Sequence, residues 1–468
     1  MKHEFKKLVA LLLTAMMIIS LAALIPPKKA NAAAPKLVAF TFDDGPCANT
    51  AGLLDGLKKR GAKVTFFMVG SSGSYGISHW TSVASRMVED GHQVANHTWS
   101  HVAPFGNLSP TRMKNEIDNV YPYLKRAMGG DFKQLVRIPG GDMSARTSAT
   151  VNHPMIRFDF DTWDYKTSDS NKVYNSIISQ VKDGSIVCLH DSHASSCTAA
   201  LMAIDYLQAR GYECVTISEL FRRRGITLEP YKTYNCAYNK GINLPAYKAP
   251  DVTVNDSDFG DRTVKVSTTD SGITLRYTTN GSIPNLSSPV WNKDKKITED
   301  MTLTVAGFDA YGTRTPVVTK NIKKGYSRFI FDKDYYLEKN PDLRTSVGTD
   351  YDALYDHFIN NGLKEGRIAS PVFNVNDYRE LNPDLDKAFK DDLTKYLDHF
   401  ESNGIKEGRI ASMSFSVGYY KEKYPDLAAA FKDNYKSYFE HYITTGRKEG
   451  RTAPAIQDFS GSFSRIEP

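Results

Sequence analysis

Short runs of β-branched and aromatic residues alternate with amphipathic stretches over residues 36–228. The runs are KLVAFTFD, AKVTFFMVG, HQVANHT, QLVRIPG, IRFDF, GSIVCLHD and YECVTI, and two amphipathic stretches cover residues 51–60 and 197–210. A third starts at Ser109-Pro110, a good cap followed by proline at the first helical position. This alternation predicts an α/β fold of βα units around a mainly parallel sheet or barrel, with the functional site at the carboxyl ends of the strands.

The pattern becomes all-β over residues 250–323. The runs VKVSTT, ITLRYTT, LTVAGF and PVVTK are separated by turns rich in Gly, Asn and Ser. Several short strands with such turns predict a small β-sandwich.

Residues 328–452 repeat every 42 residues. The units open on a phenylalanine and close on the sequence G(L/I/R)KEGR: Phe331, Phe373, Phe415. Helical stretches that end on a glycine predict three helical repeats with glycine C-caps: Gly362, Gly404, Gly446. Three histidines also recur in register: His357, His399, His441. Because metal ligands must converge on one point, we expect these histidines to have a repeated packing or capping role.

The N-terminus has the three-part pattern of a secretory signal peptide over residues 1–32. A basic MKHEFKK precedes an uncharged run from Leu8 to Ile25, and the small residues ANA end at Ala32. An uncleaved anchor is the alternative, because the run is near the length that spans a bilayer. We expect export to the cell surface or medium, cleavage after Ala32 and no membrane contact thereafter.

Composition supports several soluble domains. The chain has 468 residues, 41% of them hydrophobic and 24% charged. Its formal net charge is +6, of which the leader carries +4, so no basic stripe remains that would indicate nucleic-acid binding. Residues 453–468 form a C-terminal tail after the last repeat.

Two short stretches carry candidate chemistry. TFDDGPC places Asp43 and Asp44 where a strand ends; they are either a polar strand-to-turn junction or two carboxylates with separate roles. NHTWSH places His97 and His101 four residues apart just after another strand. With a carboxylate from a neighbouring strand end they would form a His₂-carboxylate site, in which zinc keeps one position open for water.

TFDDGP, HTWSH, RIPGG and IVCLHD, in this order, resemble the successive motifs of the polysaccharide deacetylases, the family-4 carbohydrate esterases with a NodB-type domain. The resemblance implies a distorted (β/α) barrel that removes N-acetyl or O-acetyl groups from polysaccharides with one divalent metal ion, zinc by ligand type, with cobalt as the alternative. YTTNGSIP in the β region resembles the C-terminal module of chitobiase-type enzymes.

Carrying the family's roles over position by position assigns each aspartate of the pair a separate task. Asp44 would bind the metal with His97 and His101, and Asp43 would be the general base. His190 in IVCLHD matches the general acid.

Three further roles follow from the resemblance. Arg137 matches the arginine that holds the base, and the backbone N–H of Gly140 would bind the oxyanion. The family's Asp-x-x-Asp-Trp motif is placed at residues 166–170, so that Asp169 would orient His190 and raise its pKa. The sequence departs from the family at Gly140, where an aromatic residue is common, and at Cys188, which replaces leucine as a small buried hydrophobe.

The expected function is N-deacetylation of N-acetylglucosamine units, with peptidoglycan favoured over chitin-like oligomers and acetylated xylan. The C-terminal modules would contact the cell wall. A different class of function is a surface adhesion protein with a vestigial barrel. Of the five cysteines, Cys47 and Cys197 should both lie in loops over the catalytic face, so a disulfide between them is predicted.

Overall fold

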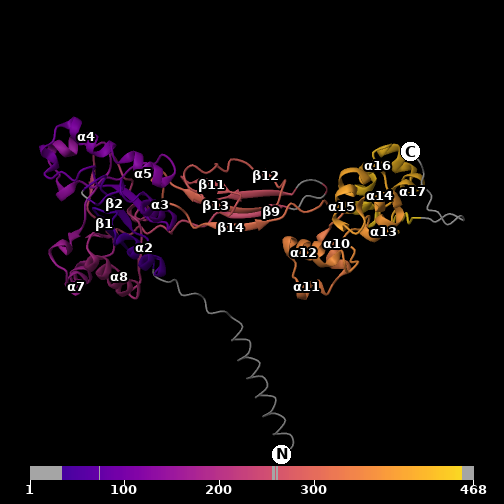
Figure 1. The fold of residues 1–468 in the computed structure, drawn as a ribbon, viewed down its shortest axis with the longest axis horizontal. Helices are drawn as coiled ribbons and strands as arrows, with labels where there is room; N and C mark the ends of the chain where they lie inside the picture. The colour runs from indigo at the N-terminus through magenta and orange to yellow at the C-terminus, as the bar shows by residue number, and fades with distance from the viewer. Residues whose placement is uncertain (1–33, 73, 256–258, 260–261, 456–468) are drawn as a thin grey trace, which may run out of the picture. The chain divides into compact units, whose positions relative to one another are not determined.

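The computed structural model describes residues 34–72, 74–255, 259 and 262–455 (Figure 1). The predicted leader and most of the predicted tail lie outside these residues. The chain falls into two compact units, one that runs to Met128 and resumes over Phe132–Ala246, and one formed by Gly129–Asp131 and the residues from Tyr247 on. Over the described ranges, no helix combines the length and apolar character needed to span a bilayer.

The first unit is built on parallel strands. These are β1 (Lys36–Asp43), β2 (Thr65–Met68), β3 (Gln93–Asn96), β4 (Met155–Ile156), β5 (Phe160–Asp161), β6 (Ser185–His190), β7 (Tyr212–Cys214) and β8 (Thr233–Tyr234). The main sheet has the order β3-β2-β1-β6-β5, β7 pairs with the first part of β1, and β4 pairs with β8. Each of these pairings is parallel, which confirms the predicted α/β core.

Helices connect these strands (Figure 1). They are α2 (Thr50–Lys59), α3 (Thr81–Glu89), α4 (Pro110–Asp118), α5 (Tyr121–Met128), α6 (Ala145–Thr150), α7 (Ser170–Gln180), α8 (Ala194–Gln208) and α9 (Ile217–Arg223). As expected, Ser109 caps α4, and its side chain accepts a hydrogen bond from the Arg112 N–H. The run QLVRIPG forms only isolated parallel bridges, in which Val136 joins Asn96 to Met155.

Strand β1 sets the position of the site. All its residues after Lys36 are buried, as expected for a strand covered on both faces. Its last residue, Asp43, pairs in register with Phe67 of β2 and with His190 of β6. The carboxyl ends of three neighbouring strands therefore meet at one edge of the sheet.

The β region forms two three-stranded antiparallel sheets, β12-β10-β9 and β11-β13-β14. The strands are β9 (Asp251–Asn255), β10 (Thr263–Ser267), β11 (Thr274–Thr278), β12 (Lys295–Lys296), β13 (Met301–Phe308) and β14 (Val318–Ile322). Side chains from both sheets, among them Val264, Leu303 and Val305, share one core with Trp291. This is the small β-sandwich that the short strands and their turns predict.

Helices follow from residue 333 to residue 446. They are α10 (Lys333–Lys339), α11 (Leu343–Ser346), α12 (Tyr351–His357), α13 (Val375–Leu381), α14 (Pro383–Phe389), α15 (Leu393–His399), α16 (Ile405–Glu407), α17 (Val417–Lys423), α18 (Pro425–Phe431) and α19 (Tyr435–His441). A π-helical turn follows α12, α15 and α19: Phe358–Gly362, Phe400–Gly404, Tyr442–Gly446.

Each of these π-helical turns ends on a glycine beside a buried tyrosine hydroxyl. A Cβ atom at Gly404 would collide with the hydroxyl of Tyr378, and the same holds for the corresponding pairs, Gly362 with Tyr336 and Gly446 with Tyr420. These glycines have no left-handed backbone, so the prediction that they are C-caps is wrong. The left-handed glycines lie four residues later, in the KEGR sequences: Gly366, Gly408, Gly450.

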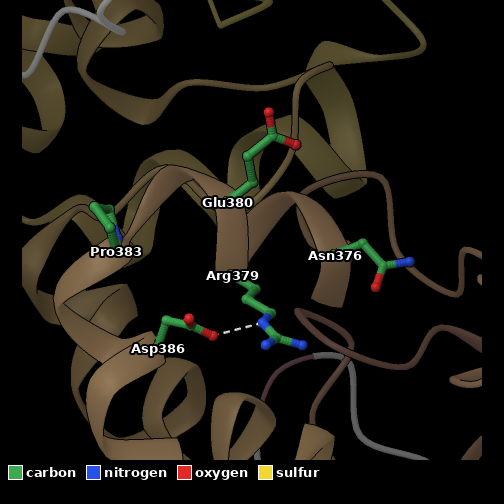
Figure 2. A pocket seen from close by; sticks show the side chains of 5 residues that line it. All are labelled: Asn376, Arg379, Glu380, Pro383 and Asp386. Carbon is green, nitrogen blue, oxygen red and sulfur yellow. Dashed lines mark hydrogen bonds and ion pairs between the residues drawn. The ribbon is translucent and has the colours of Figure 1, made fainter. Parts of the chain in front are cut away.

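A pocket of about 350 Å³ lies between α13 and α14. It is lined by Asn376, Arg379, Glu380, Pro383 and Asp386 (Figure 2). Arg379 Nε donates to Asp386 Oδ1 at 2.6 Å, and its Nη1 donates to Asp391 Oδ1 at 3.1 Å. The Arg379 guanidinium is thus paired with carboxylates and connects α13 to α14.

Candidate active site

The two adjacent aspartates point to different partners because the backbone turns between them. Asp43 is the last residue of β1 and is buried, whereas Asp44 leaves the strand at φ 71°, in the left-handed region. Asp44 Oδ1 lies 3.4 Å from His97 Nε2 and 3.2 Å from His101 Nε2. Asp43 Oδ1 instead accepts a hydrogen bond from Arg137 Nη1 at 2.7 Å.

Asp44, His97 and His101 form a group whose ligand atoms all lie within 4.8 Å of one another. Asp44 Oδ1 is buried and has no hydrogen-bond partner among the described residues. His97 Nδ1 donates to the Arg137 carbonyl at 2.8 Å, which leaves the Nε2 lone pair directed at Asp44. Two imidazole nitrogens and one carboxylate are a donor set that fits a zinc-type ion.

Asp44 and His101 in this group shift each other's pKa values. Burial opposes ionisation of Asp44, but the neighbouring His101 and His97 outweigh it and hold the pKa of Asp44 well below its ordinary value. Reciprocally, Asp44 raises the pKa of His101. A divalent cation would replace the proton that this carboxylate attracts to His101.

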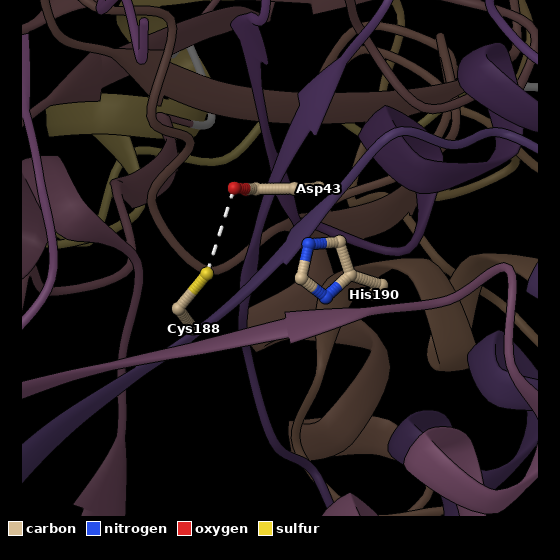
Figure 3. A group of neighbouring side chains, drawn as sticks. All are labelled: Asp43, Cys188 and His190. Carbon is tan, nitrogen blue, oxygen red and sulfur yellow. Dashed lines mark hydrogen bonds between the residues drawn. The ribbon is translucent and has the colours of Figure 1, made fainter. Parts of the chain in front are cut away.

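Asp43 is held from two sides, and Figure 3 shows one of them, the hydrogen bond from the Cys188 thiol. Arg137 is 1% exposed, and its Nε and Nη2 donate to the carbonyls of Ile156 and Arg157 at 3.1 and 2.9 Å. Its Nη1 also donates to Thr41 Oγ1 at 2.7 Å, so the guanidinium is fixed. On the other side the Cys188 thiol donates to Asp43 Oδ2 at 3.5 Å. Cys188 is therefore more than the small buried hydrophobe that the sequence predicts, because it contacts the carboxylate expected to act as base.

His190 has an aspartate partner, but that partner is Asp164. Asp164 Oδ1 lies 2.8 Å from His190 Nδ1, and its Oδ2 accepts the His190 backbone N–H at 2.7 Å. Burial would lower the pKa of His190, but the hydrogen bond and charge of Asp164 outweigh it and raise this pKa to about 9. The imidazole is thus protonated at neutral pH.

Asp169, the residue expected in this role, caps α7 instead. Its Oδ1 accepts the backbone N–H groups of Asn171 and Lys172 at 2.9 and 3.3 Å. Asp164 lies in the turn directly after β5, at the edge where His190 ends β6, whereas Asp169 lies at the start of the following helix. Asp161-Thr-Trp-Asp164-Tyr has the Asp-x-x-Asp-aromatic spacing, so the motif lies five residues before the predicted position.

Gly140 and Gly45 are glycines for different reasons. Gly140 has φ 63°, a conformation that L side chains rarely adopt, in the turn three residues after Arg137. A Cβ at Gly45 would collide with the carboxylate of Asp191. Asp191 is fully buried, and burial raises its pKa to about 7. The oxyanion role of the Gly140 N–H stays a prediction.

The predicted Cys47–Cys197 disulfide is wrong, because both thiols are free and buried. They do converge, since Cys47 Sγ lies 3.3 Å and Cys197 Sγ 3.6 Å from the carbonyl oxygen of Asp191. The expectation that both lie in loops is also wrong, because Cys197 lies in α8. The sequence thus placed the two cysteines in one neighbourhood, but they form no covalent bond.

Comparison with known proteins identifies the family to which the chain belongs. Residues 30–156 match the model for polysaccharide deacetylases, and residues 255–319 match the model for the chitobiase/beta-hexosaminidase C-terminal domain. A peptidoglycan-N-acetylglucosamine deacetylase of Bacillus cereus is 30% identical over 196 residues, which cover 40% of this chain and 89% of that protein. This chain belongs to the polysaccharide deacetylase family.

Two other relatives are matched over a smaller share of their own length. A peptidoglycan-N-acetylglucosamine deacetylase of Listeria monocytogenes is 32% identical over 204 residues, 42% of this chain and 40% of that protein. A bifunctional xylanase/deacetylase of Pseudobutyrivibrio xylanivorans is 34% identical over 194 residues, 41% of this chain and 31% of that protein. The chain thus spans about two fifths or less of these two relatives.

Proposed function

We propose that the protein is an exported, metal-dependent polysaccharide deacetylase that removes N-acetyl groups from N-acetylglucosamine units, with peptidoglycan as the favoured substrate. The observation that carries this proposal is that three groups of side chains meet at one edge of the sheet. These are the Asp44–His97–His101 group, the Asp43–Arg137 pair and the His190–Asp164 pair. A metal ligand set, a held carboxylate and a protonated imidazole are the parts that amide hydrolysis requires.

Asp44, His97 and His101 would hold one divalent ion, zinc by ligand type or cobalt, which supplies Lewis-acid activation of water and of the acetyl carbonyl. Asp43 accepts a proton from the attacking water while Arg137 holds its carboxylate in place. The backbone N–H of Gly140 binds the oxyanion that develops on the carbonyl oxygen.

His190 completes the reaction as the general acid. Its Nδ1 is engaged by Asp164, so Nε2 is the nitrogen that donates a proton to the departing amine. The C–N bond breaks as that nitrogen is protonated, and acetate and a free amino sugar are released. Because the pKa of His190 is about 9, the acid form is populated at neutral pH.

The names of the relatives support peptidoglycan as the favoured substrate. Two of the relatives are described as acting on peptidoglycan N-acetylglucosamine, and a third as a xylanase/deacetylase. We assign catalysis to residues 36–228 and contact with the cell wall to the modules at residues 250–323 and 328–452. Residues 1–32 would direct export.

The test is acetate release from peptidoglycan, chito-oligosaccharides and acetylxylan. We expect release from peptidoglycan, loss of activity after chelation and recovery on adding zinc. Asp43→Asn should abolish release, whereas Asp169→Asn, a matched change at a helix cap, should retain it. Activity that survives complete metal removal, or no release from any of the three substrates, would refute the proposal.

A further inference from the structure

Two exposed aromatic rings extend outward from His190. The Tyr165 ring packs edge-on against the His190 ring, with 5.3 Å between centroids, and the Trp163 ring lies 5.9 Å from that of Tyr165. Trp163 is 52% exposed and Tyr165 is 43% exposed. One exposed aromatic residue is ordinary, but two adjoining rings beside a catalytic acid form a continuous apolar surface at the site.

The backbone holds Trp163 in an unfavourable conformation. Its φ is 55° and its ψ 30°, in the left-handed region that bulky residues rarely adopt. The Trp163 N–H donates to Asp161 Oδ1 at 2.9 Å, and its carbonyl accepts the Lys166 N–H at 3.0 Å. These bonds fix the position of the ring although no core packing requires it, and such local strain is typical of functional sites.

A cation covers one face of the indole. Lys166 Nζ lies 3.6 Å from the centroid of the Trp163 ring. A cation at that distance is attracted to the ring and restricts its motion. Since about half of the side chain is still exposed, the opposite face is available to a ligand.

We propose that Trp163 is a sugar-binding platform, on which the free indole face stacks against a pyranose ring of the glycan next to the unit that is deacetylated. The axial C–H groups of a pyranose form an apolar face that matches an aromatic ring, while its hydroxyls remain in water. Tyr165 lies between the platform and His190, so the two rings place the glycan chain along the path to the acid. This inference rests on the proposed deacetylase function.

The turnover test compares Trp163→Ala with the wild type on N-acetylglucosamine oligomers from the dimer to the hexamer. For the hexamer we expect KM to rise about tenfold, equivalent to about 1.4 kcal/mol, with kcat unchanged. The rise should become smaller as the oligomer shortens, and Trp163→Phe should restore most of the affinity. Unchanged KM at every length, or a loss confined to kcat, would overturn the platform.

Tyr231→Ala is the matched control. Tyr231 is 50% exposed and has φ 61°, so it is also a large ring on a left-handed backbone in the same unit. It precedes β8, which runs parallel to β4, and therefore lies at the amino-terminal edge of the strands, away from the site. We expect KM to stay at the wild-type value for every oligomer.

Calorimetric binding of the hexamer separates this inference from the proposed function. If the wild-type protein binds the hexamer, Trp163→Ala loses that binding, and acetate is released neither from the hexamer nor from peptidoglycan or acetylxylan, the platform stands and the deacetylase proposal fails. If the protein releases acetate and Trp163→Ala binds like the wild type, only the platform fails. If the wild-type protein does not bind the hexamer, the platform fails, and the deacetylase proposal fails with it only when none of the three substrates releases acetate.

Discussion

The two units use histidine in opposite ways. In the first, His97 and His101 face Asp44, and His190 is bonded to Asp164, with every partner drawn from a different strand end. In the second unit, each histidine shares a hydrogen bond with a tyrosine hydroxyl of its own 42-residue repeat. The distances are 2.9, 2.8 and 3.0 Å: His357 with Tyr336, His399 with Tyr378, His441 with Tyr420.

The electrostatic consequence follows from the partner. Carboxylates raise the pKa of His101 and of His190, so these imidazoles favour the charged form or a bound cation. Beside neutral hydroxyls, burial instead lowers the pKa of His399 and His441. The regularly spaced histidines thus bond to buried tyrosines within their own repeats, whereas His97, His101 and His190 face carboxylates at the candidate active site.

The largest effect should come from replacing the two adjacent aspartates one at a time. Asp43→Asn keeps the shape but removes the base, so turnover should fall ~10²–10⁴-fold while metal still binds. Asp44→Asn removes an anionic ligand, so metal affinity should fall and excess zinc or cobalt should restore activity. Metal titration of both variants checks this, and an identical response of the two would contradict separate roles.

A smaller effect is expected from the partner of His190. An acid whose pKa is near 9 loses its proton as the pH rises through 9, so the rate should fall on the basic side. Asp164→Asn removes the charge that raises this pKa, and the basic limb should move about 1–2 pH units lower. Asp169→Asn is the control, because it weakens only the cap of α7, and its pH–rate profile should match the wild type. A shift with Asp169→Asn, or none with Asp164→Asn, would reverse the assignment.

In the second unit the sharpest change is steric. Gly404→Ala would push a methyl group against the hydroxyl of Tyr378, which we expect to cost about 1–3 kcal/mol in unfolding free energy. Gly52→Ala in α2 is the control, since its Cβ meets no atom within 4 Å and alanine favours a helix. Hydrogen exchange should show loosening of the region around α15 in Gly404→Ala, with deacetylation of soluble oligomers unchanged.

A small effect should come from Tyr378→Phe, which removes one hydrogen bond to His399 and should lower the unfolding free energy by about 1 kcal/mol, as denaturant unfolding would measure.

The smallest effect, no change in metal content, is expected when His357, His399 and His441 are replaced together with alanine. One metal ion per chain should remain bound. Elemental analysis checks this, and a fall in metal content would show that the helical histidines bind metal after all.

Local pattern was enough to predict much of this fold. The run KLVAFTFD became β1 with the predicted bounds, and Ser109 caps α4, because propensity, capping and burial depend on nearby residues. The partner of His190 was missed because Asp164 and Asp169 both follow β5 closely, and only the turn at residues 164–166 determines which carboxylate returns to the strand end. The prediction of glycine caps failed for a related reason, since Tyr378, the tyrosine that requires Gly404, lies in α13, and α14 and α15 separate the two in sequence.

The in-register pairing of β1 with β6 sets when the protein can first act. Asp43 lies near the start of the first unit and His190 near its end, yet they are neighbours across one strand pair. Asp43 and the residues proposed as metal ligands are therefore synthesised long before His190, and β1 lacks its partner β6 until that strand has been made. If the proposed roles hold, a chain emerging from the ribosome stays catalytically silent until this late segment closes the sheet.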